Sequence, residues 1–558
     1  MQPQCESRVV SNVDGRSKRA SLPKALVALF VLNAFLSMTN WWPTPFVQLD
    51  ARLAPEFVLL WIAILLLVWR MGTLSHRVVA VLACAYLLLV LGRYFDTTAP
   101  ALFGRSINLY WDALQIPRVL WVTLKSYPLW ISLLVPAALL TLVWAIYRVL
   151  RISIALAARE AAPRALASRW ALALTVAALI LVTANFFGVR ATWPLVSRPV
   201  LPTYARQAHL LATAFTAGSL EKALPPSPAF DSDLGALRGI DVNLFFIESY
   251  GLVAFSNPQA YALLTTSRDA LAAQIAASGL QVVSAYMRST TFGGGSELAH
   301  VSLLAGIDTS DPSRHDLLLT TKRPTLVQLF RERGYETHGF YPALTWDWPE
   351  KSFYGFEKFT DARDLGYQGP KLGYWSVPDQ IALALYQKRH PITGESRKRF
   401  TFFTSISSHM PFHPVPPYLQ DWRQALSATP FDAAQMAGLA AQKVDWFNMF
   451  PGYVAMIDYN YKWLAGYLAQ PTAREAFTIL LGDHQPAANV TGEGASWDVP
   501  VHIISARGDL LQRFVERGFK PGLEPAQPRI GALFDLTAML LQAFDSAGGP
   551  GAPGGHRP

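Results

Sequence analysis

Six residues that could bind a metal ion or attack a substrate lie at or near the ends of strand-like segments in this chain of 558 residues. In open α/β sheets, ligands bind at the edge where the carboxyl ends of the strands meet. Each residue alone has an ordinary structural explanation, such as helix capping or core packing. Packing explains less well why so many would reach one edge. The residues are Glu248, Ser296, His338, His409, Asp483 and His484.

Three glycines, Gly293–Gly295, directly precede Ser296 and a predicted helix at 297–305. Glycine lets the backbone approach a ligand closely, and the N–H groups at the start of a helix attract anions. A flexible turn is the ordinary alternative. Thr290 and Thr291 are nearby hydroxyl residues that compete with Ser296 for the role of nucleophile, but only Ser296 stands at the helix start.

The side-chain types at these positions favour metal-assisted chemistry. Carboxylate oxygens, an imidazole and a hydroxyl together suit a divalent cation such as Mn²⁺, Mg²⁺ or Zn²⁺. A serine hydroxyl is a weak nucleophile at its ordinary pKa, and direct coordination to a metal ion would favour its alkoxide form. The residues therefore predict a serine nucleophile activated by a bound cation.

The elements that must position these residues alternate between strand and helix patterns, which is typical of an open α/β sheet with helices on both faces. Strands are predicted at 242–249, 279–286, 336–342, 399–407, 477–483 and 499–505. Helices are predicted around 267–278, 297–305, 325–333, 376–388, 453–469 and 531–543.

The part of the chain before residue 190 contains five apolar runs without charged residues, at 25–49, 57–69, 78–92, 126–147 and 170–189. About 20 apolar residues are needed to span a bilayer, so we expect five transmembrane helices, although the second and third runs are short. Twelve Lys and Arg residues and three acids lie in 1–24, 70–77 and 148–169, which equals the formal net charge of +9. Basic loops stay in the cytoplasm, so residues after 189 are expected outside it. The basic charge therefore reports topology and does not predict nucleic-acid binding.

These features predict five parts of the chain. They are a cytoplasmic tail (1–24), a five-span transmembrane domain (25–189), a proline-rich connecting arm (190–238), an extracytoplasmic catalytic domain (239–545) and a disordered Gly/Pro-rich tail (546–558). The two cysteines, Cys5 and Cys84, precede the outer domain, which must rely on its own core because it can form no disulfide. Their position also excludes a cysteine-derived nucleophile in that domain.

The motifs "FFIES", "GGGSELAHVSLLAG", "SSHMPF" and "GDHQP", in this order after five apolar runs, resemble the lipoteichoic acid synthase group. That group is a membrane branch of the alkaline phosphatase/sulfatase superfamily. The resemblance implies a mostly parallel sheet sandwiched by helices and one divalent metal, with Mn²⁺ as the first choice. By motif, the metal ligands would be Glu248, Ser296, Asp483 and His484, with Ser296 also the nucleophile.

The resemblance also implies contacts with the substrate. His409 would face the substrate phosphate, and His338, Trp346, Trp348 and Lys351 would lie near the head group. Two departures matter: the usual nucleophile of the group is threonine, and "TWDWPEKSF" (345–353) lacks the arginine expected for a glycerol-phosphate contact. The identity of the head group therefore stays open.

The activity that the resemblance implies is transfer of a phospholipid head group, with phosphoglycerol preferred over phosphoethanolamine, to a glycan or lipid-linked acceptor. The expected location is a bacterial inner (cytoplasmic) membrane, with several spans and the catalytic domain on the periplasmic side. A metal-dependent phosphodiesterase or sulfatase-type hydrolase is one alternative, because the acceptor leaves little trace in a sequence. A membrane-anchored binding protein without catalysis is the other.

Overall fold

The computed structural model describes residues 22–546, apart from the following stretches: 42–43, 104–105, 110–111, 114–115, 118–119, 121–123, 125–127, 161–168, 190–193, 215–223, 346–347, 349, 371, 373–376 and 393–396. Its contacts divide the chain into two compact units. One contains residues 1–100 and 112–211, and the other contains residues 101–111 and 212–558. The predicted tails, 1–24 and 546–558, lie almost entirely outside the described residues.

Helices form at all five predicted apolar runs of the first unit. They are α1 (Leu22–Ser37), α2 (Pro55–Met71), α3 (His76–Phe103), α5 (Leu129–Glu160) and α7 (Arg169–Phe186), followed by α8 (Leu201–Ala214) in the predicted connecting arm. Among the described residues, two helical segments, 76–102 and 129–159, are long and apolar enough to cross a membrane. The segments 23–37 and 172–186 are shorter apolar helices. The count of five spans therefore stays a prediction.

The first apolar run is not one continuous helix over 25–49. Helix α1 ends at Ser37, and the chain then forms a short antiparallel pair, β1 (Thr39–Asn40) and β2 (Val47–Gln48). The Asn40 side chain donates hydrogen bonds to the carbonyl oxygens of Thr44 (2.7 Å) and Phe46 (3.2 Å). At Asn40, local polar contacts of this kind take the place of helical hydrogen bonds.

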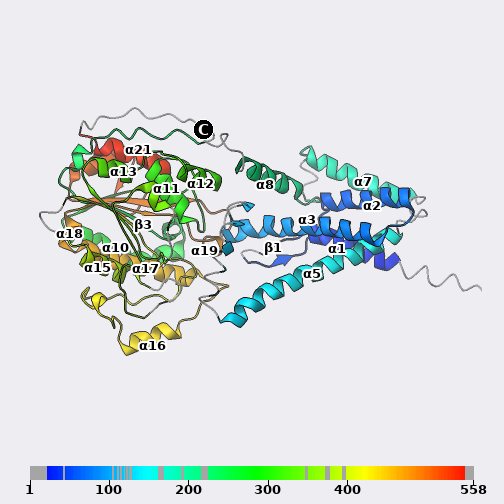
Figure 1. The fold of residues 1–558 in the computed structure, drawn as a ribbon, viewed down its shortest axis with the longest axis horizontal. Coiled ribbons are helices and arrows are strands. Elements are labelled where there is room, and N and C mark those ends of the chain that lie inside the picture. Colours follow the sequence, from blue (N-terminus) through cyan, green and yellow to red (C-terminus); the bar gives the residue numbers. More distant parts are fainter. Residues whose placement is uncertain are drawn as a thin grey trace, which may run out of the picture. The chain divides into compact units, whose positions relative to one another are not determined.

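The second unit is built on a nine-stranded mixed sheet, which confirms the predicted α/β fold (Figure 1). The strand order is β10-β4-β9-β8-β3-β7-β5-β6, with β11 paired to β4. All six predicted strands are present, as β3 (Val242–Ile247), β4 (Gln281–Arg288), β5 (Glu336–Tyr341), β7 (Arg399–Thr404), β8 (Phe477–Gly482) and β9 (Asp498–Ser505). The sequence did not predict β6 (Lys358–Asp361), β10 (Lys520–Pro521) or β11 (Gly531–Ala532).

The carboxyl ends of the strands that carry the candidate residues share one edge of the sheet. Strand β3 pairs in parallel with both β7 and β8, and β5 pairs in parallel with β7. Strand β9 is antiparallel to both β8 and β4, so β4 runs in the same direction as β8. The sheet is therefore mostly parallel.

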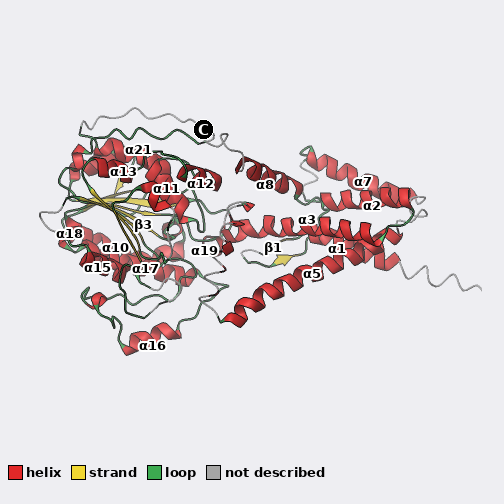
Figure 2. Cartoon of the chain, viewed as in Figure 1, coloured by secondary structure: helices red, strands yellow, loops and turns green. Residues whose placement is uncertain are grey.

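Helices cover both faces of the sheet, as Figure 2 shows. One face carries α11 (Ser296–Ala305), α13 (Leu326–Glu332) and α21 (Leu533–Phe544); the other carries α10 (Pro258–Ala277), α15 (Asp379–Arg389) and α17 (Phe450–Leu468). Successive side chains of a strand point to opposite faces. Accordingly, Phe246 belongs to the core beneath the first group of helices and Phe245 to the core beneath the second. Shorter described helices are α9 (Val253–Ser256), α12 (Pro312–Leu319), α14 (Glu350–Tyr354), α16 (Ala433–Ala441), α18 (Pro471–Arg474), α19 (Ala488–Thr491) and α20 (Gly508–Val515).

Gly482, the last residue of β8, lies against the main chain of a neighbouring loop. A Cβ atom at this position would stand within 1.8 Å of the Tyr250 carbonyl oxygen. We predict that Gly482→Ala lowers the free energy of unfolding by about 3 kcal/mol or more, because the clash is with backbone and cannot be relieved by a rotamer change. The measurement is denaturant unfolding of the purified protein.

The matched control is Gly438→Ala in α16, where a Cβ would meet nothing within 4 Å. Alanine in a helix interior is favoured over glycine by up to about 1 kcal/mol, so this variant should be as stable as the parent or more so. Equal stabilities for the two variants would contradict the close approach at Gly482.

Candidate metal and nucleophile site

Glu248 follows directly after β3, and the surrounding backbone fixes its direction. Its N–H donates to Ser405 Oγ (2.9 Å) and its carbonyl oxygen accepts from Ser408 Oγ (2.6 Å). The next residue, Ser249, has a φ of 56°, a left-handed conformation that is uncommon for residues other than glycine. The chain therefore turns sharply away from the sheet at Glu248 and leaves this carboxylate at the sheet edge.

Asp483 and His484 follow β8, the parallel neighbour of β3. The register pairs Ile247 with Gly482, so the next residue of each strand, Glu248 and Asp483, emerge side by side. Asp483 Oδ1 accepts hydrogen bonds from the N–H groups of Ser249 (2.8 Å) and His484 (2.7 Å). Both carboxylates and the His484 imidazole are buried. Parallel pairing alone thus brings together two acids separated by more than 230 residues.

The glycine loop before Ser296 has a backbone that only glycine adopts readily. Gly293, Gly294 and Gly295 have φ values of 68°, 138° and 76°. Gly295 is the N-cap of α11 and has no side chain to cap the helix. Ser296 is the first residue of the helix. The loop therefore brings the Ser296 hydroxyl and the N–H groups of the first helical turn to the same edge as the two acids.

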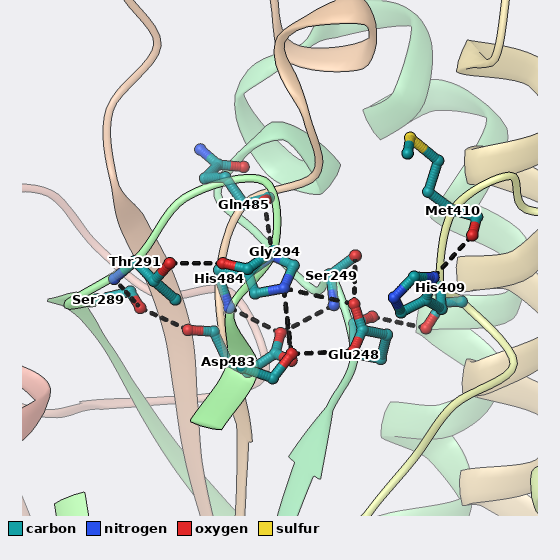
Figure 3. Close-up of polar contacts among 12 residues, drawn as sticks. Glu248, Ser249, Ser289, Thr291, Gly294, His409, Met410, Asp483, His484 and Gln485 are labelled. Atoms are coloured by element: carbon teal, nitrogen blue, oxygen red, sulfur yellow. Dashed lines mark hydrogen bonds and ion pairs between the residues drawn. The ribbon is translucent and has the colours of Figure 1, made fainter. Parts of the chain in front are cut away.

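The donor atoms lie close enough together to hold one metal ion (Figure 3). Ser296 Oγ is 3.2 Å from Glu248 Oε2 and 3.3 Å from His484 Nε2, and that nitrogen is 3.4 Å from Glu248 Oε1 and 3.7 Å from Asp483 Oδ2. Ligands about 2.1 Å from one ion in a tetrahedral arrangement would lie about 3.4 Å apart. The distances, the donor types and the burial all fit a divalent cation.

The electrostatics of the cluster point to the same conclusion. Burial, with the nearby Glu248 charge, raises the pKa of Asp483 to about 6. Burial acts to lower the pKa of His484, but the charges of Asp483 and Glu248 outweigh it and the pKa is raised. Two buried acids therefore compete for compensating charge, which a cation would supply.

Thr290 and Thr291 are less well placed than Ser296. The Thr291 hydroxyl donates to the Gly294 carbonyl oxygen (2.5 Å), a bond that braces the glycine loop. Thr290 Oγ1 is buried with no hydrogen-bond partner among the described residues, whereas the Ser296 hydroxyl contacts both Glu248 and His484. The geometry thus favours Ser296 over both.

His409 lies beside the cluster on the loop after β7, next to the Glu248 side of the site (Figure 3). Its Nδ1 contacts the Met410 carbonyl oxygen at 2.6 Å. A ring nitrogen that contacts a carbonyl oxygen carries the proton, so the neutral ring has its other nitrogen, Nε2, as an acceptor. Partial exposure of His409 leaves it accessible to a substrate at this edge.

His338 does not lie at this edge, in contrast to the sequence prediction. It is in the interior of β5, three residues before the strand ends at Tyr341, and is paired in register with Thr401 of β7. Its Nδ1 contacts the Tyr386 hydroxyl at 2.7 Å and its Nε2 lies 2.9 Å from Glu336 Oε2. The reason is the rise of a strand, about 3.3 Å per residue. Three residues place a side chain about 10 Å from the carboxyl end of its strand.

The residues predicted to contact the head group lie in different surroundings. Trp348 is buried, with its ring centroid 5.5 Å from those of Tyr341 and Phe359, and so belongs to the core. Lys351 in α14 places its ammonium 6.0 Å from the centre of the Phe359 ring. Trp346 lies outside the described residues. The described residues therefore give no picture of the head-group contacts.

Sequence reasoning missed the residues that support Glu248. Ser405 and Ser408 hold its main chain, and Asn460 of α17 donates to Ser408 Oγ (2.9 Å) while accepting from Trp463 Nε1 (3.0 Å). The run "SISS" before His409 was a possible signal, because hydroxyl residues that follow an apolar strand often bind nearby backbone groups. Asn460 offered no signal, since its contact arises only from tertiary packing.

Residues 275–499, less than half of the chain, match the sulfatase family model. The match includes Ser296, His409, Asp483 and His484, and Glu248 lies upstream of it. The second unit thus contains a segment similar to the sulfatase family. The family resemblance that the sequence motifs suggested is confirmed at this level.

Several solved structures are distantly similar. The lipoteichoic acid synthase LtaP from Listeria monocytogenes has 16% identity and a TM-score of 0.35, over 52% of this chain and 71% of that one. The Streptococcus pyogenes phosphoglycerol transferase GacH, in complex with sn-glycerol-1-phosphate, has 12% identity and a TM-score of 0.33, over 62% and 86%. The C-terminal periplasmic domain of EcEptC from Escherichia coli has 13% identity and a TM-score of 0.32, over 50% and 76%. Comparison with curated proteins finds no match.

The cluster can be tested by metal titration. We predict that Glu248→Gln weakens Mn²⁺ binding at least about 100-fold, because it removes a charged donor, and even changes in the surroundings of a ligand cost about 10–100-fold. Isothermal titration calorimetry on metal-depleted protein measures the affinity. Glu493→Gln, the same change at an exposed position, should leave the affinity unchanged. Equal binding by the two variants would remove Glu248 from the ligand set.

Proposed function

We propose that this protein is a metal-dependent membrane phosphotransferase that moves a phospholipid head group, with phosphoglycerol preferred, to an extracytoplasmic acceptor through a phospho-serine intermediate. The observation that supports it most is the Ser296 hydroxyl, 3.2 Å from the buried Glu248 and 3.3 Å from His484. A hydroxyl at the start of a helix, beside buried acids and an imidazole, suits a metal-activated nucleophile.

Glu248, Ser296, Asp483 and His484 would hold the ion, with Mn²⁺ preferred over Mg²⁺ or Zn²⁺. When bound, a divalent cation would lower the pKa of the serine hydroxyl and offset negative charge on the substrate phosphate. The Gly293–Gly295 loop would let that phosphate approach the N–H groups of the first turn of α11, since no Cβ projects from it.

The reaction has two displacements. In the first, a bond forms from Ser296 Oγ to phosphorus, the bond from phosphorus to the diacylglycerol oxygen breaks, and the serine proton is released as the departing oxygen takes up a proton. In the second, an acceptor hydroxyl loses its proton and forms the new ester bond, while the bond to Ser296 Oγ breaks and the serine regains a proton. His409, beside Glu248, would contact the phosphate oxygens as an imidazolium, because a neutral ring whose Nδ1–H is used by the Met410 carbonyl has no second N–H to donate.

The first unit supports a location at a membrane. Two of its helical segments are long and apolar enough to cross a bilayer, and the basic residues flank the apolar runs. A lipid donor would lie at the bilayer surface, so a membrane-anchored domain could reach it. Within the proposal, the chain has several spans in a bacterial inner membrane, with its sulfatase-family domain on the periplasmic side and a glycan or lipid-linked acceptor.

Hydrolysis is the main alternative, because water could take the place of the acceptor at the same site. A binding protein without catalysis is the other, and the intact set of donors, all buried and mutually close, argues against it. A site that only bound a ligand would have no need of a nucleophile so close to these donors.

We predict that Ser296→Ala reduces turnover at least about 1,000-fold, because it removes the attacking oxygen. Thr291→Val, which removes a neighbouring hydroxyl, should retain covalent labelling. The measurement is release of diacylglycerol from labelled phosphatidylglycerol, together with mass spectrometry of acid-quenched protein for a peptide in which Ser296 carries the phosphoglycerol group. Full activity of Ser296→Ala would reassign the nucleophile.

The acceptor separates transferase from hydrolase. With head-group-labelled phosphatidylglycerol, we expect little free label in the absence of an acceptor and transfer of label once a membrane glycan fraction is added. The physical reason is that a transferase site must keep the phospho-serine from water until the acceptor binds. Release of free head group at the same rate with and without glycan would favour a hydrolase.

A further inference from the structure

A polar cavity lies at the opposite edge of the sheet from Ser296. It has a volume of about 240 Å³ and is lined by residues that begin three parallel strands or end a helix. Those residues are Glu336 at the start of β5, Lys358 at the start of β6, Arg397 and Arg399 at the start of β7, and Arg389, His390 and Pro391 at the end of α15. We refer to it as the basic pocket.

Among its described lining residues, the basic pocket has four permanent cations and one carboxylate. The carboxylate, Glu336, already serves several partners: Lys358 Nζ is 2.5 Å from its Oε1, and His338 Nε2 is 2.9 Å from its Oε2. Burial acts to raise the pKa of Glu336, but bonds from Lys358 and His338 bring it to about 2. Glu336 is therefore ionised, and it cannot neutralise the remaining cations.

Arg399 is the most informative residue of the pocket. Its side chain is only 7% exposed, and its Nη1 donates to the His390 carbonyl oxygen (2.9 Å). Its Nε is buried with no hydrogen-bond partner among the described residues, and Glu336 Oε2 is 3.6 Å away. A buried guanidinium usually has its donors satisfied, since unpaired buried donors cost free energy. Arg399 lines the pocket, so its guanidinium contributes a largely buried positive charge to this site.

The neighbouring histidine reports the positive potential of the pocket. The pKa of His390 is lowered by partial burial and by the charges of Arg399, Lys358 and Arg389. Its ring contacts the Thr360 hydroxyl (Nε2 to Oγ1, 3.0 Å), so it adds no charge of its own at neutral pH. Excess positive charge in a concave, partly desolvated site attracts anions.

Structural roles explain only part of this arrangement. Arg389 is at the carboxyl end of α15, where a cation stabilises the helix dipole, and it donates to the Asp364 carbonyl oxygen (2.9 Å). Arg397 pairs with Glu357 at 3.0 Å. Lys358 and Arg399 come from separate strands, line the same cavity and both approach Glu336. The roles of Arg389 and Arg397 do not explain this convergence.

We propose that the basic pocket binds a small, multiply charged oxyanion of the phosphate class, either free phosphate or a phosphate group of a larger ligand. Arginine and lysine are the usual partners of phosphate oxygens. The proposal does not depend on Ser296 or on metal binding there, because the pocket is at the other end of the strands.

The test uses the full chain in detergent, depleted of metal by a chelator and carrying Asp483→Asn, so that the Ser296 site cannot bind the probe through an ion. Inorganic phosphate is titrated calorimetrically at constant ionic strength, with chloride as the comparison. We expect saturable phosphate binding that weakens at least tenfold in Lys358→Gln Arg397→Gln. Both side chains are about half exposed, so this double variant should fold.

The matched control is Lys388→Gln Lys398→Gln, which removes the same charge from neighbouring positions that do not line the pocket. Its affinity for phosphate should equal that of the parent. Glycerol phosphate and micelles doped with phosphatidylglycerol then identify the source of the oxyanion, as soluble or lipid-borne. Absence of binding by all probes, or equal weakening in both double variants, overturns the proposal.

Discussion

The parallel pairing of β3 with β8 is the constraint on which the rest of the site depends. Because Ile247 is opposite Gly482, the acids that follow them are forced together in a buried environment. Two carboxylates so placed repel each other, and the elevated pKa of Asp483 reflects this along with its burial. Hydrogen bonds from main-chain N–H groups stabilise one oxygen of Asp483, but they do not remove the repulsion between the Asp483 and Glu248 carboxylates. A bound cation would remove it.

Several unusual backbone positions lie close to the two acids. Gly482 has no room for a Cβ because the Tyr250 carbonyl lies against it, and Gly251 has none because of Gln485. Ser249 takes a left-handed conformation to turn the chain away. Such strained or tightly packed positions gather where a fold holds functional groups in place. The glycine loop before Ser296 is another such position. Its glycines with positive φ set the direction of α11, so their conformation has a structural role even without a ligand.

How far the sequence could predict this arrangement depended on how local each signal was. Strand-length apolar runs ending in Glu248 or Asp483 were enough to place both acids at one edge, because parallel strands have a common direction. The prediction that His338 lies at this edge was wrong, because His338 is three residues before the end of its strand and the sequence pattern did not locate that end. Trp348 could not be assigned, since an aromatic residue in a core and one in a binding site look the same in a sequence. Strand β6, with four residues, was too short to give a periodic signal. The hydrogen bond from Asn460 to Ser408 joins residues that are distant in the sequence, so it arises only in three dimensions.

The same parallel arrangement separates negative from positive groups along the strands. Buried acids gather after the carboxyl ends of β3 and β8, while cations gather at the amino ends of β5, β6 and β7. A strand of six residues is about 20 Å long, and at that separation two unit charges interact by only about 1 kcal/mol at an effective dielectric constant of about 20. An anion in the basic pocket would therefore have little direct effect on the charge at Ser296. Any influence of the pocket on turnover must come from holding a ligand near the domain, because the sheet keeps the two ends too far apart for an electrostatic contribution to the chemistry.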